Sequence, residues 1–462
     1  MPYRSSLCLM AAMVREGEIS PVELVEAHLR RIESENSRVN AFVRVFRDEA
    51  LAAARRAEAQ AVRVEITGML HGVPVTVKDC FDVAGVPTLA GSRFRLGHRA
   101  ARDAGAVARL RDEGAIILGK TNCPEFLAAY ETDNHVTGRT VNPWDPERTP
   151  GGSSGGEAAA IASCCSPGGL ASDGGGSIRV PAHFCGVAGL KPTPGRVSAA
   201  GHFPVPRNPT GFLTAAGPMA RNAKDLRLLF AALAGYDARD PLSAPAPLRA
   251  PSTAGLRAGV MERPFGVPVE PEIADAVERA GKLLQSMGLA VEPWAPRGIE
   301  RAPNLWWYFF GQLPAPFIRQ LFQGREEEAH WTATEFLRPA SDSSPATDDV
   351  LAAFAASDAM RAALVEQMED APVLLMPPCA VEAFPHRARR WLVDGREIGL
   401  FQAMMPATAW NLLGFPAVVV PMGVTPRGLP VGVQLVGRPW EDELLLELAI
   451  ELEEARGPFQ VR

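Results

Sequence analysis

The sequence predicts an α/β protein, because apolar runs with the length of buried strands alternate along the chain with stretches of helical period. The clearest strand is residues 115–118, which follow a helical pattern over residues 103–113. Two further apolar runs, at 416–421 and 431–435, precede a helical pattern over about 441–454. Hydrophobic residues make up 47% of the 462 residues, which is enough for a large core and excludes a mostly disordered chain.

The N-terminal segment carries clear helix signals. Residues 7–14 form an apolar run that charged residues follow at once, so we interpret it as a first helix and not as a signal peptide. Residues 20–32 begin with Ser20 as the N-cap, and Glu23 at the third helical position completes a capping box. The other predicted elements are helices over residues 47–62, 221–234 and 271–287 and strands over residues 73–77 and 256–261.

The overall composition excludes several classes of protein. The net charge of −6 gives no general attraction to nucleic acids or anionic membranes, and no apolar run reaches the ~18 residues of a membrane span. The seven cysteines are odd in number and contain no Cys-x-x-Cys pair, which is typical of a reduced chain without a disulfide framework or zinc site. We therefore expect a cytoplasmic protein with no metal site.

Glycine is frequent, with 42 residues, and it concentrates in two loops at the centre of the chain. Residues 150–157 are Pro-Gly-Gly-Ser-Ser-Gly-Gly-Glu, and residues 173–179 are Asp-Gly-Gly-Gly-Ser-Ile-Arg. Glycine lets main-chain N–H groups converge on a point, where they can bind a phosphate or an oxyanion. Two tight turns without a function are the alternative, but two serine–glycine loops so close together favour a functional site.

One motif argues for a phosphate site and is rejected. Residues 114–121 formally fit the nucleotide-binding pattern Gly-x-x-x-x-Gly-Lys-Thr. A phosphate-binding loop lies between a strand and a helix, whereas the four middle residues here, Ala-Ile-Ile-Leu, have the pattern of a buried strand. A nucleotide-binding kinase is therefore a weak hypothesis.

A serine nucleophile needs a base, and the eight histidines offer no clear one. None lies in a Gly-x-Ser-x-Gly elbow, and His183 is the only histidine close in sequence to Ser177. Lysine can serve if burial lowers its pKa by ~3–5 units. Lys78 ends the predicted strand 73–77, where it is either a lysine that reaches to solvent or a buried functional amine.

These features together resemble the amidase signature hydrolases. The matching segments are residues 72–79, 119–122 with 125–126, 150–157, 173–179, 185–192, 217–219 and 428–434. The resemblance covers nearly the whole chain, and only about 300–345 lacks a counterpart. It implies a single domain over residues 1–462, with a large mixed β-sheet core surrounded by α-helices and no cofactor. Residues 300–345 are then a variable helical aromatic cap over the substrate pocket.

The resemblance also implies a Ser–cis-Ser–Lys triad. Ser177 would be the nucleophile, Ser153 the bridging serine after a cis peptide bond, and Lys78 the terminal base. The oxyanion would be stabilised by the backbone N–H groups of Gly174, Gly175, Gly176 and Ser177. Supporting roles fall to Ser154, Asp173 and Arg179, of which the last two brace the loop.

The pocket predictions are less direct. Cys123 and His183 occupy positions where the family usually has other residues, so either could line the pocket, although a buried core histidine is the favoured interpretation of His183. Tyr130, Trp306 and Trp307 complete the predicted pocket. Three interpretations of residues 305–322 stay open: a lid or pocket wall, which we favour, a part of the core, or a membrane or dimer surface.

The predicted function is hydrolysis of amide C–N bonds through a serine acyl-enzyme. An aromatic pocket favours aryl or medium-chain acyl amides, and carbamates (urethanes) and esters share the carbonyl geometry. The predicted partner is a small-molecule amide, with no nucleic acid and no integral membrane segment, and a homodimer is compatible with the sequence. The alternatives are a glutaminase-type subunit of a tRNA-dependent amidotransferase and a catalytically idle interaction protein that keeps the fold.

Overall fold

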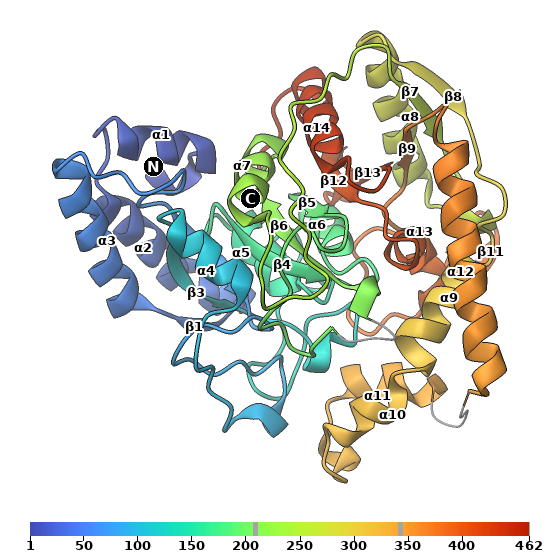
Figure 1. Ribbon diagram of the computed structural model, residues 1–462, viewed down its shortest axis with the longest axis horizontal. Coiled ribbons are helices and arrows are strands. Elements are labelled where there is room, and N and C mark those ends of the chain that lie inside the picture. The colour runs from blue at the N-terminus through green and yellow to red at the C-terminus, as the bar shows by residue number, and fades with distance from the viewer. Residues whose placement is uncertain (207–210, 341–344, 462) are drawn as a thin grey trace.

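One mixed sheet of eleven strands organises the molecule (Figure 1), and the computed structural model describes residues 1–206, 211–340 and 345–461. The strand order is β1-β3-β2-β4-β6-β5-β12-β13-β9-β7-β8. Parallel pairs join β2 to β3 and β4, and β7 to β8 and β9, whereas the other neighbours are antiparallel. The predicted α/β class is therefore confirmed, and the sheet is mixed.

The strands of this sheet have the following bounds: β1 Phe42–Val45, β2 Pro74–Lys78, β3 Ile116–Thr121, β4 Gly168–Asp173, β5 Ala188–Lys191, β6 Ala215–Ala220, β7 Arg257–Val260, β8 Ala290–Pro293, β9 Val373–Met376, β12 Ala417–Val424 and β13 Pro430–Gly437. A separate hairpin contains β10 (Arg390–Val393) and β11 (Arg396–Gly399).

The helices have the following bounds: α1 Leu7–Arg15, α2 Pro21–Val39, α3 Arg47–Val62, α4 Gly105–Asp112, α5 Gly155–Ala162, α6 Arg179–Cys185, α7 Ala223–Leu233, α8 Pro271–Ser286, α9 Ala302–Trp307, α10 Ala315–Gln320, α11 Trp331–Leu337, α12 Thr347–Gln367, α13 Leu400–Leu412 and α14 Asp442–Arg456. None of the helices in the described part of the chain is both long and apolar enough to cross a membrane.

Local signals place several elements correctly. The capping box of α2 is present, because the Ser20 hydroxyl accepts from the Glu23 N–H and the Glu23 carboxylate accepts from the Ser20 N–H. The two predicted C-terminal strands pair as β12 and β13, with Val419 opposite Gln434. The helix that follows them is α14, which packs against α7 and β12.

The last six residues of the rejected nucleotide motif form β3, and all six are buried. The Lys120 ammonium group lies 2.7 Å from Asp79 Oδ1 and donates to the Pro87 carbonyl oxygen, so it is used inside the fold. A lysine held in this way cannot reach a phosphate group in solvent. The structure therefore gives this motif a structural role.

The segment between β8 and β9 is helical and contributes no strand to the sheet in its described residues. Figure 1 shows α10 and α11 at the lower edge of the view and α12 along one side of the molecule. Residues 341–344, at the end of the predicted cap 300–345, lie outside the described residues. Helix α9 packs against α12 and α13, so this segment is joined to the C-terminal half of the fold.

Candidate active site

The parallel strands β2 and β4 bring two site residues to one edge of the sheet. Their register pairs Val77 with Leu170, so Lys78 at the end of β2 lies near the end of β4, where its side chain contacts Ser172. The Lys78 side chain is completely buried, and its Nζ lies 2.7 Å from Ser153 Oγ and 3.2 Å from Ser172 Oγ. Burial lowers the pKa of Lys78 below its ordinary value, which favours the neutral amine.

Ser153 is carried by the glycine-rich loop that precedes α5. The peptide bond between Gly152 and Ser153 is cis, and a Cβ atom on Gly152 would lie only 2.5 Å from the Ala129 carbonyl oxygen. Ser154 ties this loop to the second one, because its N–H donates to the Ser177 carbonyl oxygen at 3.2 Å. The structure therefore brings the predicted triad segments together at one place.

Asp173 and Arg179 form a buried ion pair that holds the second loop. Arg179 Nη2 lies 2.9 Å from Asp173 Oδ1, and both side chains are completely buried. Burial alone would raise the pKa of Asp173, but the adjacent guanidinium group holds it well below its usual range. Arg179 also donates to Gln434 Oε1 and Asn411 Oδ1, both of which sequence reasoning missed as site residues. The sequence signal that could have identified Gln434 was its place in residues 428–434, one of the segments that resemble the family.

The predicted oxyanion site needs one correction. The Gly176 N–H donates to Asp173 Oδ1 at 2.7 Å and is therefore not free to bind an oxyanion. The N–H groups of Gly174, Gly175 and Ser177 have no hydrogen-bond partner among the described residues. Three of the four predicted donors are thus available.

Close aromatic packing is a second reason why positions 174 and 175 require glycine. The carbonyl oxygen of Gly174 accepts from Trp306 Nε1 at 2.7 Å, and that of Gly175 accepts from the Tyr130 hydroxyl at 2.7 Å. A Cβ atom on Gly175 would lie 2.2 Å from Trp306 Cζ2, and one on Gly174 would lie 2.6 Å from Phe310 Cε2. No side chain fits at either position while these rings stay in place.

A largely aromatic cavity of about 430 Å³ adjoins this loop. Tyr130, Trp306 and Trp307 line it, in agreement with their predicted place in a pocket. The full lining is Ala128, Ala129, Tyr130, Glu131, Trp306, Trp307, Thr332, Glu335, Phe336, Pro339, Phe384, Arg389, Leu400 and Phe401. Because Tyr130 and Trp306 also bond to the Gly175 and Gly174 carbonyl oxygens, the cavity lies next to the loop that carries the predicted nucleophile, although Ser177 itself is not among its lining residues.

One end of the cavity carries three charged side chains. Arg389 donates to both carboxylate oxygens of Glu335, at 2.6 and 2.7 Å, and to Glu131 Oε1 at 2.6 Å. Burial alone would raise the pKa of Glu131, but hydrogen bonds from His386, the Arg387 N–H and Arg389 hold it below its usual range. The cation of the cavity is therefore already paired with two carboxylates.

Two predicted pocket residues lie elsewhere. His183 is completely buried in α6, where its Nδ1 accepts from the Gly432 N–H at 2.9 Å, so its place in the pocket prediction was wrong and its interpretation as a core histidine is supported. Cys123 is also buried and does not line the cavity. Burial raises the pKa of its thiol, and the charge of Lys78 acts in the opposite direction. Cys123 thus lies on the inner side of the site.

The aromatic segment 305–322 divides between two of the expected roles. Trp306 and Trp307 line the cavity, whereas Phe309 is completely buried and packs on Phe212 and Phe354. Pocket wall and core are therefore both present within one short stretch, because successive residues of a helical segment face different sides.

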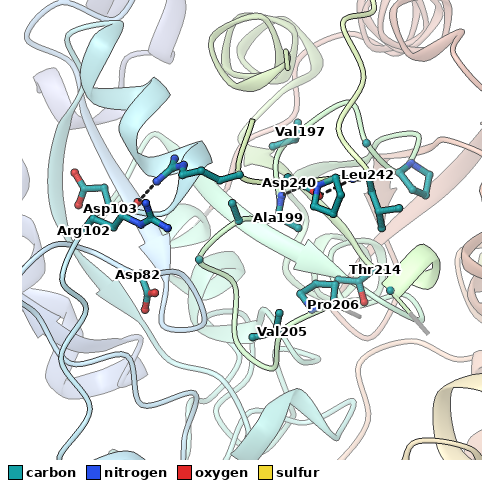
Figure 2. Close-up of a pocket in the computed structure, with 17 residues that line it drawn as sticks. Asp82, Arg102, Asp103, Val197, Ala199, Val205, Pro206, Thr214, Asp240 and Leu242 are labelled. Carbon is teal, nitrogen blue, oxygen red and sulfur yellow. Dashed lines mark hydrogen bonds between the residues drawn. The ribbon is translucent and has the colours of Figure 1, made fainter. Parts of the chain in front are cut away.

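Figure 2 shows a second cavity, of about 250 Å³, lined by other residues. Two of its charged groups are bonded within the protein: Arg239 donates to the Asp103 carbonyl oxygen, and Asp240 accepts from the N–H groups of Ala199 and Leu242. None of the predicted catalytic residues lines it. The same holds for the aromatic cavity, but its Tyr130 and Trp306 bond to the loop that carries Ser177, so the aromatic cavity is the candidate substrate site.

Comparison with known proteins agrees with this architecture. Residues 23–446 match the family model Amidase. One subunit of the glutamyl-tRNA(Gln) amidotransferase of Chloroflexus aurantiacus is 34% identical over 95% of this chain and 93% of that protein. Indoleacetamide hydrolase of Bradyrhizobium diazoefficiens is 35% identical over 97% of this chain and 86% of that protein.

Solved structures are also similar. A bacterial aryl acylamidase of the amidase signature family superposes with a TM-score of 0.87 at 27% identity, covering 98% of this chain and 96% of that chain. A structure described as a vestigial protein complex that reveals the origins of an s-triazine catabolic enzyme superposes with a TM-score of 0.91 at 29% identity, covering 99% and 100% of the two chains.

Proposed function

The chain belongs to the amidase signature family of amide-hydrolysing enzymes, and from this premise we propose that Ser177, Ser153 and Lys78 carry its reaction. The observation that supports this most directly is the 2.7 Å contact between Lys78 Nζ and Ser153 Oγ in a completely buried site. Burial lowers the pKa of this lysine, so its neutral form, which can accept a proton, is favoured over that of an exposed lysine.

In the proposed mechanism, neutral Lys78 accepts a proton from Ser153 while Ser153 accepts one from Ser177. Ser177 Oγ attacks the substrate carbonyl carbon, and the free N–H groups of Gly174, Gly175 and Ser177 stabilise the oxyanion. The C–N bond breaks as the relay returns the proton to the leaving nitrogen. Water then hydrolyses the acyl-enzyme by the same relay.

We propose aryl or medium-chain acyl amides as the substrate class. The aromatic lining of the cavity supports this, since such a wall stabilises an apolar acyl or aryl group. The names of two relatives, an indoleacetamide hydrolase and an aryl acylamidase, point to the same class. Carbamates and esters present the same carbonyl geometry and are secondary candidates.

The second candidate is the glutaminase subunit of a tRNA-dependent amidotransferase. Its support is the 34% identity to one chain of a glutamyl-tRNA(Gln) amidotransferase over nearly the full length of both proteins. Glutamine carries a carboxylate that needs a cationic partner. Among the residues that line the cavity, Arg389 and no other is a cation, and Glu131 and Glu335 already hold it. We therefore rank this function second.

We also propose that residues 300–345 act as a cap in a single domain of 1–462, with the described part of this segment closing one side of the pocket. Trp306 and Trp307 support this role, because both line the cavity from the segment.

The test is a panel of p-nitroanilides, carbamates and esters of graded acyl length, measured beside release of ammonia from glutamine. We expect turnover of aryl and medium-chain anilides that is abolished in Ser177→Ala. Wild-type turnover in Ser177→Ala would overturn the assignment of the nucleophile. Glutaminase activity with no anilide turnover would favour the second candidate.

A further inference from the structure

We propose that His202 is a positioning residue of this site, which directs the lone pair of Lys78 toward Ser153 by fixing the hydroxyl group of Ser172. The inference rests on the proposed function of Lys78 as the base. It adds a residue that lies outside the triad and that does not line the aromatic cavity.

His202 lies in the loop between β5 and β6, which also forms a wall of the cavity in Figure 2. Val205 of the same loop faces that cavity, whereas the His202 ring is 4% exposed and packs edge-on against Phe81, with ring centroids 5.0 Å apart. The Phe203 N–H donates to the Cys80 carbonyl oxygen at 2.7 Å, so the loop is held against the segment that follows Lys78.

The hydrogen-bond partners of the imidazole show which of its two nitrogens carries the hydrogen. His202 Nδ1 lies 2.8 Å from the Pro204 carbonyl oxygen, and a carbonyl oxygen can only accept, so Nδ1 carries the hydrogen. Burial lowers the pKa of His202 to about 4, so the ring is neutral at pH 7. Nε2 is therefore an acceptor, and it lies 3.0 Å from Ser172 Oγ. The Ser172 hydroxyl must donate to it.

This orientation decides how Lys78 is bonded. The Ser172 oxygen, having given its hydrogen to His202, accepts from Lys78 Nζ at 3.2 Å, and the Ser172 carbonyl oxygen accepts from Nζ at 3.4 Å. A neutral amine has two N–H groups and one lone pair, so both N–H groups are then in use. The lone pair takes the remaining tetrahedral direction, toward Ser153 Oγ at 2.7 Å.

Without an acceptor at residue 202, the Ser172 hydroxyl is free to turn and donate to the lone pair of Lys78. It then competes with Ser153 for the base, and it stabilises the neutral amine. The competition lowers turnover, and the stabilisation of the neutral amine lowers the pKa of Lys78 further. The other ionisable groups that act on Lys78 are Cys80, Cys123, Glu157 and Asp173, and all four favour its charged form.

The experiment compares His202→Leu, which cannot accept a hydrogen bond, with His202→Gln, whose amide oxygen can. The control is His28→Leu, since His28 is also completely buried, bonds a backbone carbonyl oxygen through Nδ1, and has a pKa lowered to about 4. It lies on α2, outside the site. The probe is the best p-nitroanilide of the panel, with kcat and KM measured from pH 5 to 9.

For His202→Leu we expect kcat to fall about 10-fold, the equivalent of one hydrogen bond, with KM nearly unchanged. The midpoint of the acidic limb moves to lower pH, whereas loss of packing would admit water to Lys78 and move it to higher pH. His202→Gln restores most of kcat, and His28→Leu keeps the wild-type profile. The double variant with Ser172→Ala is no slower than Ser172→Ala alone, because His202 acts through Ser172.

A wild-type kcat and pH profile in His202→Leu would overturn the inference while leaving the proposed function intact. The same holds for a shift of the midpoint to higher pH, or for fully additive losses in the double variant. Failure of the proposed function is distinct, since it would appear in the wild-type enzyme or in Ser177→Ala. Thermal unfolding beside His28→Leu separates a loss of stability from a loss of positioning.

Discussion

A substitution of Gly175 by alanine tests whether ring packing, and not only the exposure of N–H groups, requires glycine in the loop. The new Cβ atom would lie 2.2 Å from Trp306 Cζ2, which is well over 1 Å short of the carbon–carbon contact distance of about 3.5–4.0 Å. The Trp306 ring has little room to move, because its Nε1 donates to the Gly174 carbonyl oxygen and its face stacks on Phe310 with centroids 4.9 Å apart. Overpacking of this kind destabilises a protein by ~1–3 kcal/mol.

We therefore expect Gly175→Ala to unfold at lower denaturant concentration and to lose most of its amidase activity, since the loop that carries Ser177 must shift. Combination with Trp306→Leu removes the clashing ring and should recover stability relative to Gly175→Ala. Gly281→Ala is the matched control, because its Cβ atom meets nothing closer than 3.7 Å and alanine is favoured within a helix. Unchanged stability and activity in Gly175→Ala would refute the reasoning, as would a double variant that is worse than the sum of its parts.

Three further predictions concern charge and capping. Activity should fall on acidification, because Lys78 acts as a base only in its neutral form, which it takes at a pH above its lowered pKa. A flat kcat/KM profile from about pH 5 to 9 would contradict a lysine base. Arg179→Met should destabilise the protein by ~3–5 kcal/mol in urea unfolding, because it leaves the Asp173 carboxylate buried without its cation, whereas Arg30→Met removes an exposed pair and should leave the midpoint unchanged. Ser20→Ala should lower the free energy of unfolding by about 1 kcal/mol through loss of the N-cap, and an unaltered unfolding midpoint would show that the cap contributes nothing.

The sequence predicted what is decided locally. The start of α2 follows from Ser20 and Glu23, which bond to each other's backbone N–H groups within one turn. The end of β2 at Lys78 followed from an apolar run and a charged residue after it. The glycine loops were located because their composition is unusual and because they resemble a family.

Contacts between distant segments could not be predicted in this way. His183 was ambiguous because its partner, the Gly432 N–H, comes from β13, 249 residues later. Ser172 and His202 carried no motif of their own, and they reach Lys78 through the order of strands in the sheet. The hydrogen bond from the Gly176 N–H to Asp173 depends on the conformation of a turn, which residue types alone do not define.

The position of β12 and β13 has a consequence for how the enzyme is assembled during synthesis. These strands are translated last of the eleven, yet in the sheet they lie between the group that ends at β5 and the group that begins at β9. The two groups therefore have no continuous backbone pairing until the ribosome has released the final strands. Gln434 of β13 also completes the set of acceptors around Arg179, so the loop that carries Ser177 gains its final brace in the same event. The continuous sheet and the full set of acceptors around Arg179 therefore both depend on the same pair of strands.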